Sequence, residues 1–248
     1  MQVTFVGSGD AFGSGGRFNT CIMVESAAAR VLVDCGASSL VAMRRLDIDP
    51  NSIDGVVISH LHGDHFGGLP FFLLDAQLVS RRTRALRLIG PPGFGERLFA
   101  AREIFFPRSS VVQPTYDLQI EEILPGEQVM LRDIAVSGFE VDHFCAAPPL
   151  ALRLEAGGRS LCYTGDTQWT DRLIEAAKNV DLLIAEAYFF DKKIKWHLDY
   201  ATLAQNLDRI GARRVVLTHM SADMLARRNE VAECDLASDG ARFDLNDG

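Results

Sequence analysis

The sequence predicts an α/β protein, a four-layer αβ/βα sandwich built as a single domain over residues 1–248. Two β-rich halves each finish in alternating helical and strand segments, which favours two packed sheets with helices on their outer faces. No low-complexity linker separates the halves. Hydrophobic residues make up 48% of the 248-residue chain, which is enough material for a sizeable core.

Apolar and β-branched runs bounded by turn residues predict the elements of the first half. The predicted strands are residues 2–6, 21–25, 30–34, 55–59 and 85–89. The predicted helices are residues 38–46, 66–77 and 94–106. The helix over 38–46 is followed by Asp49-Pro50, a stop signal, and the strand over 85–89 by Gly90-Pro91-Pro92-Gly93.

The second half repeats this organisation. The predicted strands are residues 118–124, 127–131, 134–141, 150–155, 160–164, 181–185 and 213–218. The predicted helices are residues 170–177 and 200–210. Residues 232–245 are predicted to form a hairpin about Asp239-Gly240, a turn-forming dipeptide.

Composition excludes several classes of protein. The net charge of −8 does not favour a binder of long nucleic acids. No apolar run approaches the roughly 20 residues that span a bilayer, and residues 1–5 lack the features of a signal peptide. The five cysteines are odd in number and scattered, which predicts reduced thiols in a cytoplasmic protein.

Residues 59–69 contain the pattern H-x-H-x-D-H, formed by His60, His62, Asp64 and His65. Imidazole and carboxylate groups suit Zn²⁺ and similar first-row ions. Four such ligands are too many for one catalytic ion that must keep an open position. We therefore predict two adjacent divalent metal ions, Zn²⁺ by ligand type, with Mn²⁺ and Fe²⁺ left open.

Three further ligand-type residues follow predicted strands. His143 follows the strand over 134–141, Asp166 follows an apolar run in Thr164-Gly165-Asp166, and His219 follows Val215-Val216-Leu217-Thr218. Loops at strand ends place functional groups on a rigid scaffold. Each residue alone would more often be a hydrogen-bonded core residue or a cap, but the cluster at 60–65 favours metal binding.

In this series of motifs the sequence resembles the metallo-β-lactamase-fold hydrolases over nearly the whole chain. The resemblance implies that the first metal is held by His60, His62 and His143. It implies that the second metal is held by Asp64, His65 and His219. Asp166 would bridge the two ions, and Asp34 would support the metal loop through hydrogen bonds.

His197 indicates the branch of this family. It lies 22 residues before His219 and opens the predicted helix over 200–210. With Asp34-Cys35-Gly36 and Leu217-Thr218-His219, it resembles the ribonuclease Z-type phosphodiesterases, in which the corresponding histidine is thought to donate a proton or hydrogen bond to the scissile phosphate. The alternative is that His197 only caps the helix.

Two departures from the family patterns narrow the substrate. Asp166 stands where true β-lactamases commonly place a cysteine, which disfavours antibiotic hydrolysis. Members that trim tRNA commonly carry a long basic arm between the third-motif histidine and the bridging aspartate. Here His143 and Asp166 are only 23 residues apart, enough for two strands and a tight turn.

The leading functional prediction is a binuclear metal-dependent hydrolase acting on a small phosphodiester or cyclic nucleotide. A metal-bridging hydroxide would be the nucleophile, with Asp64 orienting it and His197 as the proton donor. The alternative is a carboxylic ester, thioester or lactone hydrolase on the same metals. A tRNA 3′-processing endoribonuclease and a non-catalytic metal-binding protein rank below these, and self-association as a homodimer is also considered.

Overall fold

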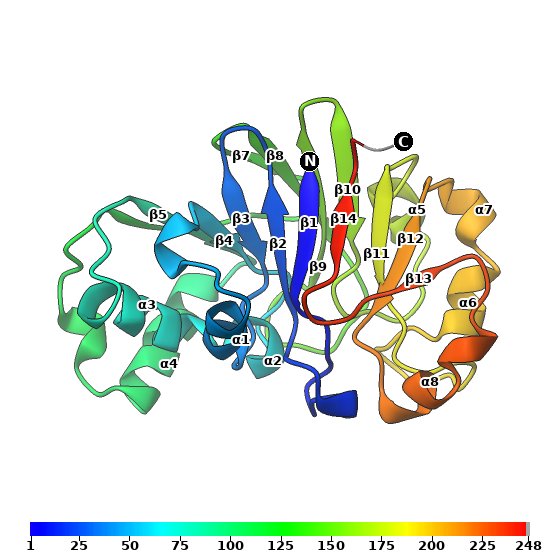
Figure 1. Cartoon of the computed structure of the whole chain (residues 1–248), viewed down its shortest axis with the longest axis horizontal. Helices are drawn as coiled ribbons and strands as arrows, with labels where there is room; N and C mark the ends of the chain where they lie inside the picture. The colour runs from blue at the N-terminus through cyan, green and yellow to red at the C-terminus, as the bar shows by residue number, and fades with distance from the viewer. Residues whose placement is uncertain (247–248) are drawn as a thin grey trace.

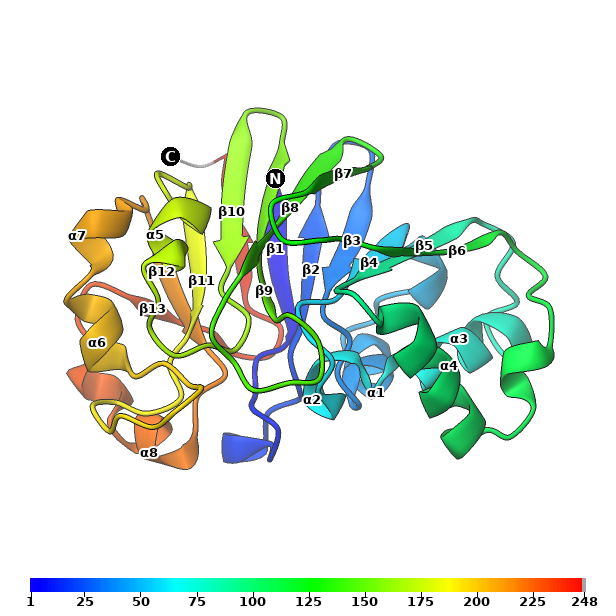
Figure 2. The ribbon, with the colours of Figure 1, turned by 180° about the vertical axis from the view of Figure 1, so that it is seen from behind.

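The computed structural model describes residues 1–246. Within these residues two seven-stranded sheets pack against each other, as Figures 1 and 2 show from opposite sides. The first sheet has the order β14 (Arg242–Asp244), β1 (Gln2–Gly7), β2 (Cys21–Glu25), β3 (Arg30–Val33), β4 (Gly55–Val57), β5 (Leu86–Gly90) and β6 (Leu118–Glu122). In this order, each pair of neighbours from β14 to β3 is antiparallel, and each pair from β3 to β6 is parallel.

The second sheet has the mirrored arrangement. Its order is β13 (Asp235–Leu236), β12 (Val215–Thr218), β11 (Leu182–Glu186), β10 (Arg159–Tyr163), β9 (Leu150–Ala156), β8 (Ile134–Glu140) and β7 (Gln128–Leu131). Strands β7 to β10 are antiparallel, and β10 to β13 are parallel.

Helices cover the outer face of each sheet, so the predicted four-layer sandwich is confirmed (Figure 1). The first sheet carries α1 (Ser39–Arg45), α2 (Gly63–Phe66), α3 (Leu69–Leu78) and α4 (Phe94–Phe105). The second sheet carries α5 (Arg172–Ala176), α6 (Tyr200–Ala204), α7 (Leu207–Ile210) and α8 (Ala222–Ala226). Short 3-10 turns lie at η1 (Ser14–Gly16), η2 (Pro50–Ser52), η3 (Ser109–Val111) and η4 (Arg228–Glu230).

The central core takes side chains from both sheets. Phe5 and Val33 of the first sheet and Leu152 and Ile184 of the second belong to one buried cluster. Side chains alternate between the two faces of each strand. Those on the inner faces form this central core, and those on the outer faces pack beneath the helices. Because the two halves share this core, we propose that residues 1–248 form one domain.

Two predicted helices are interrupted. The helix expected over 66–77 is divided into α2 and α3 at Gly67 and Gly68. A Cβ atom on Gly68 would lie 2.2 Å from the carbonyl oxygen of Gly36, so only glycine allows this close approach to the turn after β3. The helix expected over 200–210 is divided into α6 and α7.

The predicted C-terminal hairpin over 232–245 is wrong. Strand β13 pairs in parallel with β12, whereas β14 pairs antiparallel with β1 in the other sheet. The turn at Asp239-Gly240 therefore carries the chain from one sheet to the other. Tertiary pairing with longer strands outweighs the local turn signal.

The candidate site lies where the carboxyl ends of several strands meet. Strands β3, β4, β8, β10, β11 and β12 have their carboxyl ends at the same edge of the sandwich, the lower edge in Figure 1. Residues that follow these strands therefore converge. Among residues 1–246, no helix is long and apolar enough to cross a membrane.

Candidate metal centre and active site

The loop between β4 and α2 is fixed by the buried carboxylate of Asp34, which follows β3. Asp34 Oδ1 accepts a hydrogen bond from the backbone N–H of Ser59 at 2.7 Å. Its Oδ2 accepts from Ser59 Oγ at 2.8 Å and from His65 Nδ1 at 2.7 Å. The predicted supporting role of Asp34 is therefore confirmed.

These hydrogen bonds determine which nitrogen of each imidazole is free. Because the carboxylate of Asp34 only accepts, His65 Nδ1 carries a proton, and Nε2 is the nitrogen that can bind a cation. Ser59 Oγ donates to Asp34, so it accepts from His60 Nδ1, 3.1 Å away, and His60 Nε2 is also free. His143 Nδ1 donates to the carbonyl of Trp196 at 2.7 Å, which frees its Nε2 in the same way.

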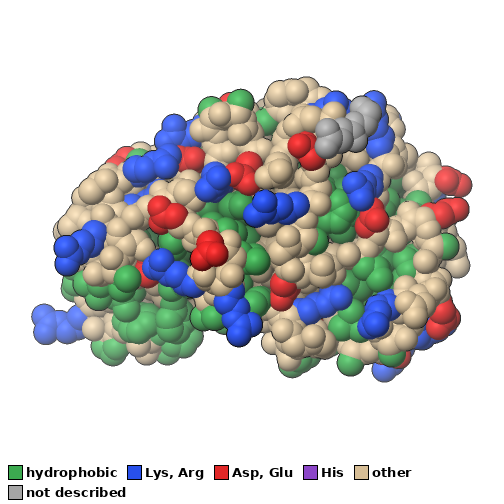
Figure 3. All heavy atoms as spheres, in the orientation of Figure 1, with side chains coloured by type: hydrophobic (Ala, Val, Ile, Leu, Met, Phe, Trp, Pro, Cys, Tyr) green, Lys and Arg blue, Asp and Glu red, His purple; other side chains and the backbone are tan. Residues whose placement is uncertain are grey.

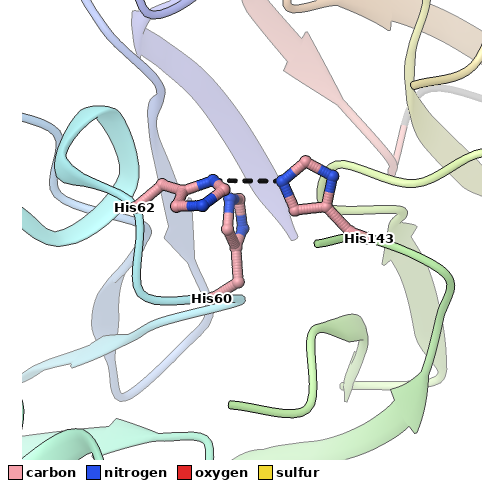
Figure 4. A group of neighbouring side chains, drawn as sticks. All are labelled: His60, His62 and His143. Atoms are coloured by element: carbon pink, nitrogen blue, oxygen red, sulfur yellow. Dashed lines mark hydrogen bonds between the residues drawn. The ribbon is translucent and has the colours of Figure 1, made fainter. Parts of the chain in front are cut away.

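The free nitrogens of the first group point toward one another. His60, His62 and His143 offer ligand atoms that all lie within 4.8 Å of each other. His62 Nδ1 lies 3.0 Å from His143 Nε2, and the His60 ring lies beside both (Figure 4). His60 and His143 are buried, and His62 is partly exposed.

The second group contains Asp64, His65, Asp166 and His219. Asp64 Oδ2 lies 3.2 Å from Nε2 of both His65 and His219. Asp166 reaches His65 Nε2 with Oδ1 and His219 Nε2 with Oδ2, each at 3.4 Å. Asp166 Oδ2 is also 3.9 Å from His60 Nε2, so this carboxylate lies between the two groups.

The donor set fits two divalent cations. Zn–N and Zn–O bonds of about 2.0–2.2 Å place two ligand atoms of a tetrahedral site roughly 3.3 Å apart, close to the separations in both groups. Among the described residues, His60 Nε2, His65 Nε2 and Asp166 Oδ1 are buried without a hydrogen-bond partner. Buried polar atoms without partners are costly, and bound cations would satisfy them.

The charge states also suit cation binding. Burial, followed by the neighbouring His65, holds the pKa of His60 well below its ordinary value, so its imidazole is neutral. Burial opposes ionisation of Asp166, but His219 and His65 outweigh it and hold the Asp166 pKa well below its ordinary value. Burial also opposes protonation of His219, yet the charge of Asp166, the hydrogen bond with Asp64 and the nearby Glu186 carboxylate raise its pKa to about 10. Bound cations would replace such protons.

The structure therefore brings all seven predicted ligand side chains into two adjacent groups. Their role as metal ligands stays a prediction.

A carboxylate that the sequence analysis missed holds His197. Glu186, the buried last residue of β11, hydrogen-bonds His197 Nδ1. The same carboxylate accepts from the backbone N–H groups of Thr167 at 2.9 Å and Leu198 at 3.2 Å. Glu186 is therefore a hydrogen-bond partner of His197, and it also belongs to a third cluster of possible ligands with Asp166, His197 and His219.

His197 lies beside the second group without belonging to it. Its Nδ1 is 3.9 Å from Asp166 Oδ2, and its ring stacks on Tyr188 with centroids 4.8 Å apart. Burial lowers the pKa of His197, but Glu186 outweighs burial and raises it above the ordinary value. Its side chain is 24% exposed, so the ring can meet a bound substrate. Asp199, and not His197, caps α6 by accepting from the backbone N–H of Thr202, so the capping alternative for His197 is wrong.

Three non-glycine residues of the site have left-handed backbone conformations. The φ angles are 60° at Asp34, 75° at Trp196 and 55° at His219. Such conformations cost of order 1–3 kcal/mol each and persist where surrounding contacts fix them. Here they turn the chain so that Asp34 and His219 face the same centre. The conformation of Trp196 directs its carbonyl group toward His143 Nδ1.

Comparison with known proteins agrees with this fold. Human tRNase Z, short form (ELAC1), is 24% identical with a TM-score of 0.80 and 99% coverage of both chains. The metallo-β-lactamase-fold protein YhfI from Bacillus subtilis is 21% identical with a TM-score of 0.80 and 98% coverage of both chains. A ribonuclease Z of Archaeoglobus fulgidus is 26% identical over 89% of this chain and 87% of its own length.

The fold and the clustered donor set define a metal-dependent hydrolase of the metallo-β-lactamase fold, in its ribonuclease Z-like branch. The chain belongs to the family described as anti-Pycsar protein Apyc1, whose family model matches residues 1–243.

Asp34→Asn tests how the metal loop is oriented. The amide has one oxygen and so cannot accept all three hydrogen bonds. With that oxygen on the Ser59 N–H, the NH2 group faces His65 Nδ1, so His65 would shift its proton to Nε2 and lose its ligand lone pair. We expect Zn²⁺ affinity to fall by roughly 10–100-fold with the fold retained, as measured by isothermal titration calorimetry and circular dichroism. Asp133→Asn, which alters a hydrogen bond with Ser26 in a turn joining two strands, is the control. Equal Zn²⁺ affinity in both variants would contradict this role.

Proposed function

We propose that the protein is a phosphodiesterase that hydrolyses a small phosphodiester, such as a cyclic nucleotide, with two bound Zn²⁺ ions. When bound, the ions supply Lewis acidity to the phosphate oxygens and lower the pKa of a water molecule so that it attacks near neutral pH. His60, His62 and His143 would hold the first ion, and Asp64, His65 and His219 the second. Asp166, which lies between the groups, would bridge them.

The observation that carries the proposal is the His197–Glu186 pair. The imidazole is tied to Glu186 through Nδ1, so its Nε2 is left for the substrate. Glu186 favours the protonated ring, which can donate to the leaving oxygen of a phosphodiester. Asp64, whose carboxylate contacts both His65 and His219, would orient the attacking water.

The chain between His143 and Asp166 supports a small substrate. It consists of a loop at 144–149 and the β9–β10 hairpin, whose strands pair from Ala156 and Arg159 onward. This interval has no room for the basic arm of tRNA-trimming relatives, and the net charge of −8 opposes long nucleic acids. All five cysteines are free thiols, which supports a cytoplasmic location.

A second candidate is cleavage of RNA, because the curated relatives carry the name ribonuclease Z. Carboxylic ester, thioester or lactone hydrolysis is the remaining alternative, since the same donor set could serve those reactions. The proposal ranks phosphodiesters first because a proton donor beside the metals is of most use for a poor alkoxide leaving group.

A substrate panel separates these candidates. The Zn²⁺-loaded protein is assayed on bis-p-nitrophenyl phosphate, 2′,3′-cyclic nucleotides, a precursor tRNA, lactoylglutathione and a lactone. We expect turnover of the two phosphodiester substrates and no cleavage of the precursor tRNA. Thioester or lactone turnover without phosphodiesterase activity would refute the proposed substrate class, and Mn²⁺- and Fe²⁺-loaded samples would show which metal supports activity.

His197→Ala and His219→Ala should differ in kind. The first should keep both metals while kcat falls by roughly 10²–10⁴-fold, and the loss should shrink for p-nitrophenolate, which needs little protonation. The second should weaken occupancy of the second metal and lower activity on all substrates alike. Metal analysis and kcat on cyclic nucleotides and p-nitrophenyl esters check this. Metal loss in His197→Ala, or its unchanged phosphodiester turnover, would contradict the assigned role.

Glu186→Gln tests whether Glu186 acts through His197. We expect kcat to fall with KM nearly unchanged, and the loss to be smaller for good leaving groups, as with His197→Ala. In the double variant the two losses should not add, because residues that act as a unit are strongly non-additive. Glu155→Gln, on the outer part of the β9–β10 hairpin, is the control. Additive losses would show that Glu186 has only a structural role.

A further inference from the structure

An apolar recess opens beside the first group of histidines. Its volume is about 450 Å³, within the roughly 300–1,000 Å³ range of small-molecule sites. It lies between α4 and the two loops that carry His62 and His143. Its walls include Leu61, Phe66, Ala100, Ile104, Ala146 and Ala147.

The recess adjoins the two loops that carry His62 and His143 of the candidate metal centre. Leu61 and Gly63, which both line it, are the chain neighbours of His62, and Ala146 lies three residues beyond His143. His62 and His143 themselves face each other at 3.0 Å (Figure 4). A Cβ atom on Gly63, which is itself exposed, would have no neighbour within 4 Å, so the space over this lining residue is open. Part of a molecule bound beside His62 and His143 would therefore lie next to the recess.

The lining selects a carbon-rich group. Most of it is aliphatic or aromatic carbon, and charged side chains enter it only from the exposed Glu96 and Arg97 of α4. The apolar wall continues outward through Ile104 and Phe105, which are 76% and 51% exposed. On the face drawn in Figure 3, hydrophobic side chains also gather at the lower left, over α3 and α4. Such walls favour burial of an apolar ring over a phosphate.

The position of His197 decides which end of the substrate the recess takes. Neither His197 nor Glu186 lines it. The leaving oxygen must lie at His197 to receive its proton, so in an acyclic diester the group that departs is not the one in the recess. We propose that this recess binds the retained ester group of a phosphodiester substrate and selects a flat, carbon-rich ring there. This inference rests on the proposed phosphodiesterase function.

A pair of aromatic side chains near the site is an alternative place for the ring of the substrate. Phe144 follows His143 in the chain, and Trp196 precedes His197. The rings of Phe144 and Trp196 lie 5.9 Å apart. They are 73% and 39% exposed, and neither lines the recess. The test must therefore separate the recess from this aromatic pair.

Two substrates with one leaving group isolate the retained group: methyl p-nitrophenyl phosphate and phenyl p-nitrophenyl phosphate. We expect wild-type kcat/KM to be about tenfold higher for the phenyl ester. Ala100→Trp fills the recess from an exposed position of α4 and should remove this preference through KM, with the methyl ester changed by less than about twofold. Ile104→Ala, which trims the same wall, should reduce the preference. Ala204→Trp, at an exposed site of α6, is the matched control and should change neither substrate.

Binding measurements keep the two proposals separable. Calorimetry with phenylphosphonate and methylphosphonate on the Zn²⁺-loaded protein should show tighter binding of the phenyl compound in wild type and not in Ala100→Trp. If neither ester is hydrolysed but this difference holds, the phosphodiesterase proposal fails and the recess remains a binding site. If Ala100→Trp affects both ester groups equally or neither, the recess assignment is overturned. Selective loss of the phenyl substrate in Phe144→Ala, with Ala100→Trp unaffected, would assign the ring to the aromatic pair instead.

Discussion

The buried carboxylate of Asp166 sets the constraint on which the site depends. It is only 2% exposed, and its charge must be balanced by groups that the fold brings to it. His65 and His219 contact it from opposite sheets, the first from the loop after β4 and the second from the loop after β12. His219 and His65 hold the pKa of this carboxyl group well below its ordinary value. Bound divalent ions would balance its charge more completely.

Both halves of the sandwich are needed to build the centre. The first sheet supplies the metal loop and its support, Asp34. The second supplies His143, Asp166 and His219 from the ends of parallel or co-directed strands. The shared central core holds the two edges in register, so the precision of the site comes from packing far from the chemistry. Loss of the sheet-to-sheet contact would separate the ligands even if each sheet stayed intact.

Each of four histidines near the centre is held through one ring nitrogen, which leaves the other nitrogen available. His60, His65 and His143 are tied through Nδ1 to neutral groups or to a carboxylate outside the cluster, and their Nε2 atoms face inward. His197 is tied through Nδ1 to Glu186, a buried carboxylate that favours the protonated ring. The same side chain would thus serve as a ligand in one place and as a proton donor in another. His65 and His197 both have carboxylate partners, so the Nδ1 contact fixes which nitrogen is available, and the position of that nitrogen would decide the role.

The sequence by itself determined the layered fold class and the seven clustered side chains, because strand periodicity and the H-x-H-x-D-H spacing are local properties of the chain. It also indicated His197. It did not reveal Glu186, since a single glutamate after an apolar strand has no motif, and only the packing of β11 beside β10 and β12 brings it to His197. It was wrong about the hairpin at Asp239-Gly240, because the two strands pair with distant partners. Strand β14 pairs with β1, more than 200 residues away, and β13 pairs with β12, about 20 residues away. The sequence likewise did not reveal the recess beside His62. Its walls come from α4 and two separate loops, and such a cavity depends on how these distant segments pack.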